Sequence, residues 1–265
     1  MTSVTKLTID STRALKMWRV WTYLGAQDIK AKFHRSFFGP VWIVLTTGFF
    51  VTGVGIIYGL LFGQPVREFL PYLACGFALW GFIVASITDA SATFLRAEGY
   101  IKQFSYPKQI YLLRTLISSV IVLLIGIAVV IPVQLFFNEV TPLGWLYALP
   151  GLALLIMAAL GHIAISAYLG TRFRDFPHAM AVMLQMMFFI TPIMFPIKLL
   201  HEKGLGFIYQ FNPLYYLIDV VRHPIIQGEL ALPENYLYAG IYVLATWAAA
   251  LVVAYKLDSR VVFLL

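Results

Sequence analysis

Long runs without acidic or basic side chains alternate along this chain with short segments that carry most of the charge. Six of these runs are long enough to cross a bilayer, because about 20 apolar residues span roughly 30 Å of hydrocarbon as a helix. Backbone at that depth must satisfy its own hydrogen bonds, so each run predicts a transmembrane helix. The predicted spans are residues 37–62, 69–92, 112–137, 146–170, 177–198 and 235–256.

A seventh charge-free run, residues 204–218, is shorter and contains the pair Asn212-Pro213. It is too short to cross the membrane, so we expect residues 199–234 to form a re-entrant hairpin between the fifth and sixth spans. The predicted fold class is an all-α integral membrane protein with six transmembrane helices, and residues 1–265 form a single transmembrane domain.

The composition supports the membrane interpretation and excludes several other classes. Hydrophobic residues make up 61% of the chain and charged residues 12%, whereas charged residues make up about 25% of ordinary globular proteins. The single cysteine, Cys75, allows no intrachain disulfide and too few thiolates for a structural zinc or iron–sulfur site. No metal site is expected on this chain.

The distribution of positive charge predicts the orientation. Of the 19 Lys and Arg residues, 15 fall on the side that holds both termini and four on the other. Because cytoplasmic loops carry the excess of Lys and Arg, both termini are predicted to be cytoplasmic. This topology accounts for the formal net charge of +7, so nucleic-acid binding is not needed to explain it.

Residues 11–35 have the pattern of an amphipathic helix that lies in the cytoplasmic interface. At 100° per residue, Arg13, Lys16, Arg19 and Lys30 share one face, and apolar side chains such as Trp18 lie opposite. Gly25 is a position where this helix could break in two. The segment is either a passive anchor or a lever that transmits motion from a cytoplasmic partner.

The sequence contains no recognisable catalytic constellation. Serine hydrolase, zinc protease, dinucleotide-binding and P-loop motifs are absent, and the five histidines are scattered. Only His162 lies well inside a span, where an interhelical hydrogen bond is favoured over a proton relay. A transporter without an ion-coupling carboxylate ladder must take its energy from elsewhere, and a separate ATPase is the usual source.

Aromatic residues make up 16% of the chain, and several lie in the middle of predicted spans. Aromatic faces stack on sugar rings, although packing against neighbouring helices explains most such residues equally well. Candidates for the lining of a substrate path are Trp42, Phe49, Phe50, Tyr58, Trp80, Phe188 and Phe189.

The order of short motifs resembles the transmembrane subunit of ABC-type polysaccharide exporters, the bacterial permeases that move O-antigen, capsule or teichoic acid chains. The resemblance covers nearly the whole chain. It rests on QDIKAKF and SFFGPVW at residues 27–33 and 36–42, EGYIKQFSYPK at 98–108, RFRDF at 172–176, TPI at 191–193 and FNPL at 211–214. Gln27 replaces the arginine usual in the family, and Phe38 and Pro40 also depart from its pattern.

The resemblance implies a dimer of this chain in the bacterial inner membrane, bound to two copies of a cytoplasmic ATPase subunit. ATP and magnesium would bind to that partner, so no cofactor is expected on this chain and it is not an enzyme by itself. The cargo would be a lipid-linked polysaccharide, and membrane lipids surround the assembly. The first and fifth spans would line the path, and the outer hairpin with Asn212 and Pro213 would gate it.

The resemblance also assigns roles to two charged groups of residues. A lipid pyrophosphate, or alternatively anionic lipid, would meet a basic cluster formed by Arg13, Arg19, Lys30, Lys32 and Arg35. The loop between the second and third spans would contact the ATPase through Arg96, Glu98, Tyr100, Lys102, Tyr106, Pro107 and Lys108.

Three other functions remain open on the sequence alone. An ABC exporter of drugs or small lipids would share the six-span architecture. A membrane enzyme acting on lipid-linked sugars would need an interfacial cluster of carboxylates or histidines. A passive channel would need no ATPase.

Overall fold

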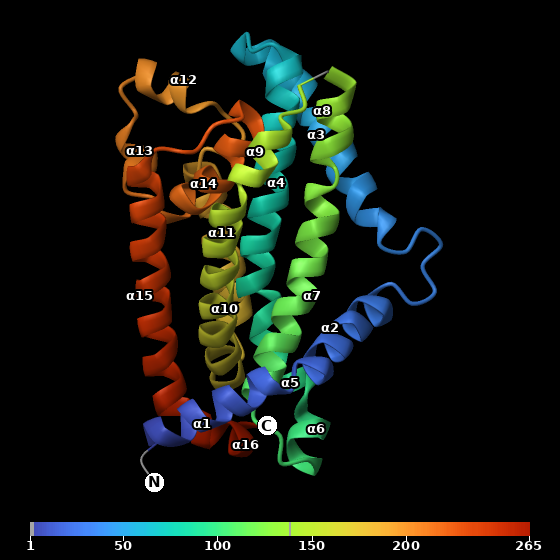
Figure 1. Ribbon diagram of the computed structural model, residues 1–265, viewed down its shortest axis with the longest axis vertical. Coiled ribbons are helices and arrows are strands. Elements are labelled where there is room, and N and C mark those ends of the chain that lie inside the picture. The colour runs from blue at the N-terminus through green and yellow to red at the C-terminus, as the bar shows by residue number, and fades with distance from the viewer. Residues whose placement is uncertain (1–2, 138) are drawn as a thin grey trace.

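The chain folds into a bundle of long helices with shorter helices at both ends (Figure 1). The computed structural model describes residues 3–137 and 139–265, and every regular element in those residues is a helix. Within these described residues, five helical stretches are long and apolar enough to cross a membrane. These stretches are Val41–Leu61, Val66–Arg96, Gln109–Phe137, Pro142–Arg172 and Pro233–Leu264.

Most of these stretches are built from more than one helix. The helices are α3 (Val41–Phe62), α4 (Val66–Ile87), α7 (Gln109–Ile127), α8 (Val130–Phe137), α9 (Pro142–Tyr147), α10 (Leu149–Arg172) and α15 (Pro233–Leu257). Shorter helices complete them, namely η1 (Asp89–Ala92) and α5 (Thr93–Arg96) after α4, and η2 (Asp258–Arg260) and α16 (Val261–Leu264) after α15. Five of the six predicted spans are thus confirmed as helices of transmembrane length.

The predicted span over residues 177–198 is a shorter helix in the structure. Helix α11 covers Phe176–Ile190, which is 15 residues, or about 22 Å at 1.5 Å per residue. The helix ends there because Pro192 disfavours helical backbone at Thr191 and has no amide hydrogen to donate. Residues 191–196 continue without regular structure to α12 (Ile197–Glu202), which lies at the end of the bundle opposite the termini (Figure 1).

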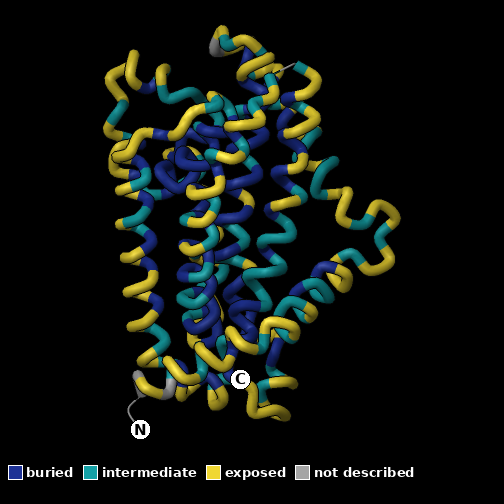
Figure 2. The backbone as a smooth tube through the Cα atoms, viewed as in Figure 1, coloured by how far each residue is buried: buried dark blue, intermediate teal, exposed yellow. Residues whose placement is uncertain are grey.

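The predicted outer hairpin contains three helices. They are α12, α13 (Phe207–Gln210) and α14 (Pro213–Gln227). Most of α14 is buried against α10, α15 and α4 (Figures 1 and 2). The segment is therefore a packed part of the bundle.

The N-terminal segment forms two helices that lie across the end of the bundle where the C terminus also lies, here called the terminal end (Figure 1). The helices are α1 (Ser3–Lys16) and α2 (Trp18–Lys32). The break falls at Met17, so the expected break at Gly25 is wrong. Gly25 instead lies inside α2, where a Cβ atom would come within 2.8 Å of the Arg114 carbonyl oxygen on α7. Glycine is needed there for close packing of the two helices.

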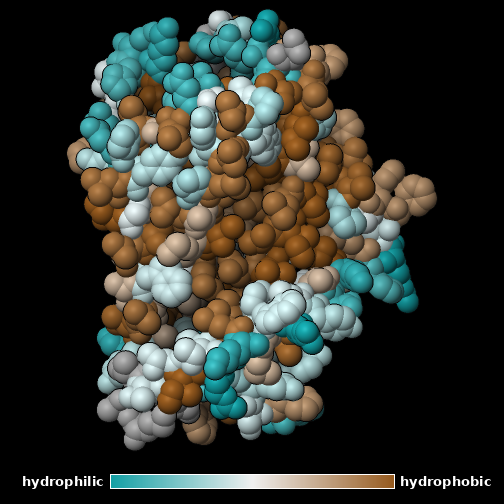
Figure 3. Space-filling model, viewed as in Figure 1, coloured by the Kyte–Doolittle hydropathy of each residue, from teal (hydrophilic) through white to brown (hydrophobic). Residues whose placement is uncertain are grey.

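Side-chain hydropathy divides the surface into three zones. On the face that Figure 3 shows, a broad hydrophobic belt crosses the middle of the bundle and hydrophilic side chains lie at both ends. This arrangement is what a bilayer requires of a multi-pass protein. Helix α4 is largely buried at the centre, whereas α3 has little buried surface and leans away from the bundle (Figures 1 and 2).

A polar clamp joins three helices inside the belt. Ser86 on α4 donates to the Ile83 carbonyl, so its oxygen accepts from Nδ1 of His162 on α10 at 3.2 Å. Nε2 of the imidazole then accepts from the Tyr242 hydroxyl on α15 at 2.8 Å. Both ring nitrogens are satisfied, which supports the interhelical hydrogen bond expected for His162.

Candidate functional site

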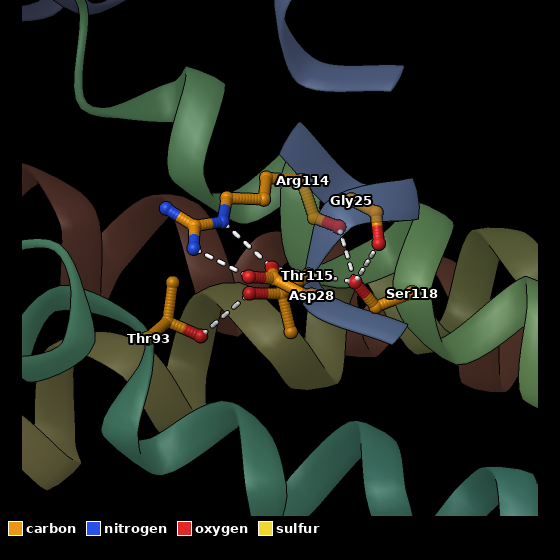
Figure 4. A network of polar contacts seen from close by, with 6 residues as sticks. All are labelled: Gly25, Asp28, Thr93, Arg114, Thr115 and Ser118. Atoms are coloured by element: carbon orange, nitrogen blue, oxygen red, sulfur yellow. Dashed lines mark hydrogen bonds and ion pairs between the residues drawn. The ribbon is translucent and has the colours of Figure 1, made fainter. Parts of the chain in front are cut away.

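A polar cavity of about 470 Å³ lies at the terminal end, between α2, the end of α4 and α7. At the edge of this cavity, the Arg114 guanidinium on α7 donates two parallel hydrogen bonds to the Asp28 carboxylate on α2 (Figure 4). The distance from Arg114 Nε to Asp28 Oδ2 is 2.6 Å. The hydroxyl of Ser118 lies 2.9 Å from the Gly25 carbonyl oxygen and contacts the same carboxylate. A bidentate ion pair with additional hydrogen bonds fixes α2 on α7.

The opposite wall of the cavity comes from the segment that follows α4. Asp89 pairs with Lys32 at 3.7 Å, and the Arg96 guanidinium donates to the Asp89 carbonyl. The hydroxyls of Thr93 and Thr115 are 3.0 Å apart and join α5 to α7 (Figure 4). Two cationic side chains, Lys32 and Arg96, thus line a polar hollow at the end of the hydrophobic belt.

The structure divides the predicted basic cluster. Lys32 lines the cavity, whereas Arg13, Arg19, Lys30 and Arg35 are exposed outside it. Sequence reasoning missed the ion pair of Asp28 with Arg114. Its only signal was that Asp28 is the one acidic residue among the cations of residues 11–35.

The loop predicted to contact an ATPase contains α6 (Glu98–Gln103), which projects beyond the terminal end (Figure 1). Lys102 pairs with Glu98 at 2.6 Å on this exposed helix. The rings of Tyr100, Phe104 and Tyr106 stack in a row, with centroids 6.4 and 5.8 Å apart. These aromatic and charged side chains form an exposed surface.

The last two residues of that loop have internal partners. Pro107 is buried, and the Lys108 ammonium pairs with the Asp258 carboxylate at 3.3 Å. The Tyr168 hydroxyl donates to the same carboxylate at 2.8 Å. Lys108 therefore tethers the loop to the C-terminal segment of the chain.

Four of the predicted path aromatics come together in one row that crosses three helices. Phe50 on α3 contacts Phe77 on α4 with ring centroids 4.9 Å apart, and Phe77 contacts Phe188 on α11 at 5.8 Å. Phe188 also contacts Trp80 at 5.9 Å and Phe189 at 5.6 Å. We call these five residues the aromatic row. Phe77 was missed because a sequence does not give the rotation of a helix about its axis.

The members of the aromatic row differ in exposure. Phe189 is 66% exposed and Phe50 is also exposed, whereas Trp80 is 7% exposed and packs in the core. The remaining candidates lie on α3 outside the row: Trp42 contacts Phe38 at 5.2 Å, Phe49 is 75% exposed and Tyr58 is partly buried. The exposed members of the predicted set of path aromatics therefore lie on α3 and α11.

At the end of the bundle opposite the termini, here called the far end, side chains bind the irregular backbone of residues 191–196. Asn212 caps α14 by accepting from the Leu214 amide at 3.0 Å, and its amide donates to the Thr191 hydroxyl at 2.8 Å. Pro213, the first residue of α14, needs no amide partner there. Asn212 thereby joins the start of α14 to the end of α11.

A buried arginine completes this connection. Arg222 on α14 is 2% exposed, donates to the Pro192 carbonyl at 2.8 Å and lies over the Tyr72 ring of α4 at 3.9 Å. The Tyr72 hydroxyl donates to the Pro192 and Phe195 carbonyls at 3.0 and 3.2 Å. Side chains thus satisfy carbonyls of a segment that forms no helical hydrogen bonds of its own, as irregular backbone inside a membrane protein requires.

The fold and these sites define a multi-pass helical membrane protein with a charged cavity at one end and an interrupted helix at the other. Among the described residues, no three His, Cys, Asp or Glu side chains gather as a metal site would need. The family described as ABC-2 type transporter matches residues 15–226. The chain therefore belongs to the ABC-2 type transporter membrane family.

Several similar proteins are described as export or transport proteins for polysaccharides. An O-antigen export system permease protein of Klebsiella pneumoniae is 26% identical over 217 residues, which are 81% of this chain and 82% of the relative. A permease with the same description from Myxococcus xanthus is 20% identical over 86% of this chain and 88% of the relative. The polysialic acid transport protein of Escherichia coli is 23% identical over 84% of this chain and 87% of the relative.

Proposed function

We propose that this chain is the transmembrane subunit of an ATP-driven exporter that moves a lipid-linked polysaccharide out of the cytoplasm. The observation that carries the proposal is the match to polysaccharide and O-antigen transport permeases over more than four fifths of both chains. Two copies of the chain form the path, and two copies of a cytoplasmic ATPase subunit bind ATP and magnesium and drive it.

In this proposal the terminal end faces the cytoplasm of a bacterium and the protein lies in its inner membrane. The excess of Lys and Arg on the side of the termini supports this orientation. Helix α11 and residues 191–196 together make the remaining membrane crossing, the fifth in chain order, because they connect the terminal end to the opposite end of the bundle (Figure 1). Helices α12 to α14 then form the outer re-entrant segment, and Asn212 holds its gate against α11.

The exposed aromatic faces of α3 and α11 support the assignment of the path. A sugar polymer is polar and long, so it needs a continuous tunnel whose stacking surfaces tolerate different sugars. Proteins that bind single-stranded nucleic acids without sequence preference use aromatic side chains in the same way. Phe49, Phe50 and Phe189 offer such surfaces, and pairing of two copies across these helices would enclose them. Trp80 supports the row from inside the core.

The polar cavity beneath α2 supports a docking place for the lipid pyrophosphate. Lys32 and Arg96 supply cationic donors next to the hydrophobic belt, where a lipid-linked headgroup would arrive sideways from the bilayer. Exposed α6 is the contact for the ATPase. The ion pair of Asp28 with Arg114 makes α2 move with α7, so motion of the ATPase would reach the cavity.

ATP turnover of the reconstituted complex, measured against the concentration of the lipid-linked glycan, tests the docking place. Lys32→Gln and Arg96→Gln should each raise the glycan concentration needed for half-maximal ATP turnover by roughly tenfold, since each removes one charge-assisted hydrogen bond. Lys30→Gln is the matched control, because Lys30 is exposed on the same helix outside the cavity. Equal effects of Lys32→Gln and Lys30→Gln would refute the docking place.

A further inference from the structure

A second, apolar groove lies where α1, α7, α10 and α15 meet at the terminal end. Its volume is about 240 Å³ and its wall is almost entirely hydrocarbon. Small side chains on α10 and α15 leave the space open, among them Gly161, Ala164, Ala250 and Ala254. Trp247 lines its side.

The groove spans the boundary between the hydrophobic belt and the terminal end. Helices α7, α10 and α15 all belong to stretches of transmembrane length. Helix α1 lies across them and presents Leu7, Ser11 and Leu15, which recur at every fourth position on one helix face. Water does not fill an apolar hollow of this kind, so hydrocarbon chains of the bilayer are its natural occupant.

Charge and one unpaired polar atom indicate what the hydrocarbon is attached to. Arg13 and Lys16 on α1 and Lys256 near the end of α15 are exposed around this end of the bundle and attract anionic headgroups. Gln109, the first residue of α7, lines the groove, and its Oε1 atom is buried without a hydrogen-bond partner. A buried acceptor requires a donor, and a headgroup hydroxyl supplies one.

We propose that this groove binds an acyl chain of an anionic phospholipid. The phosphate lies near the cations of α1 and α15, and the Gln109 Oε1 atom accepts from a hydroxyl of the headgroup. The lipid fills the space between α1 and the bundle and thereby holds α1 in place. This site is separate from the cavity beneath α2 and does not depend on the identity of the cargo.

Fluorescence quenching by brominated lipid tests the proposal on the full chain. The protein is reconstituted in phosphatidylcholine with a minor fraction of brominated phosphatidylglycerol or, in parallel, brominated phosphatidylcholine. Subtraction of the Trp247→Phe variant isolates the signal of the tryptophan in the groove. Phosphatidylglycerol should quench this signal several-fold more than phosphatidylcholine at the same fraction.

Variants that fill the groove locate the effect. Ala164→Leu and Ala254→Leu should abolish the excess quenching, whereas Ala248→Leu, exposed on α15 outside the groove, should retain it. Equal quenching by the two headgroups in the wild-type protein would overturn the proposal whether or not the variants fold. Excess quenching that persists in folded Ala164→Leu and Ala254→Leu proteins would also overturn it.

Discussion

The ion pair between Asp28 and Arg114 should control whether α2 stays on the bundle. Replacement of Asp28 by Asn keeps the shape of the side chain and removes its charge, so the Arg114 guanidinium loses its only ion-pair partner among the described residues. Exposed ion pairs contribute about 0–1 kcal/mol, and breaking a fully buried pair costs about 3–5 kcal/mol. The Arg114 and Asp28 side chains are 16% and 31% exposed, which places the cost near 2 kcal/mol.

A cost of about 2 kcal/mol corresponds to roughly 30-fold more frequent release of α2 from α7. Thiol labelling measures this release directly. Ile29 is buried on α2, and the single native cysteine, Cys75, is also buried. In an Ile29→Cys background, the maleimide reaction rate should therefore rise roughly 30-fold when Asp28→Asn is added.

A double-mutant cycle separates this interaction from general loosening. Asp28→Asn and Arg114→Gln together should cost less than the sum of the two single changes, by about 1–2 kcal/mol. Lys30→Gln, exposed on the same helix, is the control and should leave the labelling rate unchanged. An unchanged rate in Asp28→Asn, or strictly additive effects in the cycle, would refute the account of how α2 is held.

Substitutions at four further positions have distinct expected results. Asn212→Ala should lower the free energy of unfolding by about 1–2 kcal/mol in thermal denaturation, and Asn212→Asp should recover the helix cap but not the bond to α11; identical losses would contradict this. Trp80→Ala should lower the free energy of unfolding by about 3–5 kcal/mol, because Trp80 packs in the core. Phe189→Ala should slow export and leave the melting temperature unchanged. Export at the normal rate by Phe189→Ala would remove Phe189 from the path. Tyr242→Phe should lower the free energy of unfolding by about 0.6 kcal/mol and leave export intact, because it removes one hydrogen bond by which His162 joins the helices. Loss of export with unchanged stability would instead indicate that His162 relays protons.

Charge-free runs predicted six spans, and five of them are long helices, because the cost of a charge in hydrocarbon acts on every residue of a span. The same reasoning placed the end of the fifth span at residue 198, whereas α11 ends at Ile190. Hydropathy does not respond to the backbone preference of a proline, and Thr191-Pro192 ends the helix inside an apolar run. The proline is evident in the sequence. Its effect on helix length, however, depends on which side chains donate hydrogen bonds to the backbone carbonyls that follow the end of the helix.

Those partners lay outside what the sequence could predict. Arg222 counts toward the cations of the outer segment, yet the structure buries it against Tyr72 and the Pro192 carbonyl. Phe77 carried no signal beyond that of any other aromatic residue in a span. Both depend on which helices are neighbours and on how each is rotated, and neither property follows from the periodicity of one helix.

The candidate site was predicted in part for a related reason. Lys32 and Arg96 were singled out from separate segments, and the fold brings them to one cavity. The other cations of the predicted cluster lie outside the cavity, because an amphipathic pattern defines a polar face without showing which of its charges meets a neighbouring helix. Asp28 was assigned no role, since its partner Arg114 is distant in sequence and only the packing of α2 on α7 brings the two side chains together.

Reconstitution with the ATPase subunit tests the central claim most directly. The chain, co-expressed with the nucleotide-binding subunit from the same source, is purified in nanodiscs, and ATP turnover is measured with and without the lipid-linked glycan. We expect the two proteins to purify as a complex and the glycan to raise ATP turnover. Failure of any ATPase to bind the folded chain, or glycan movement through the chain without nucleotide, would contradict the account.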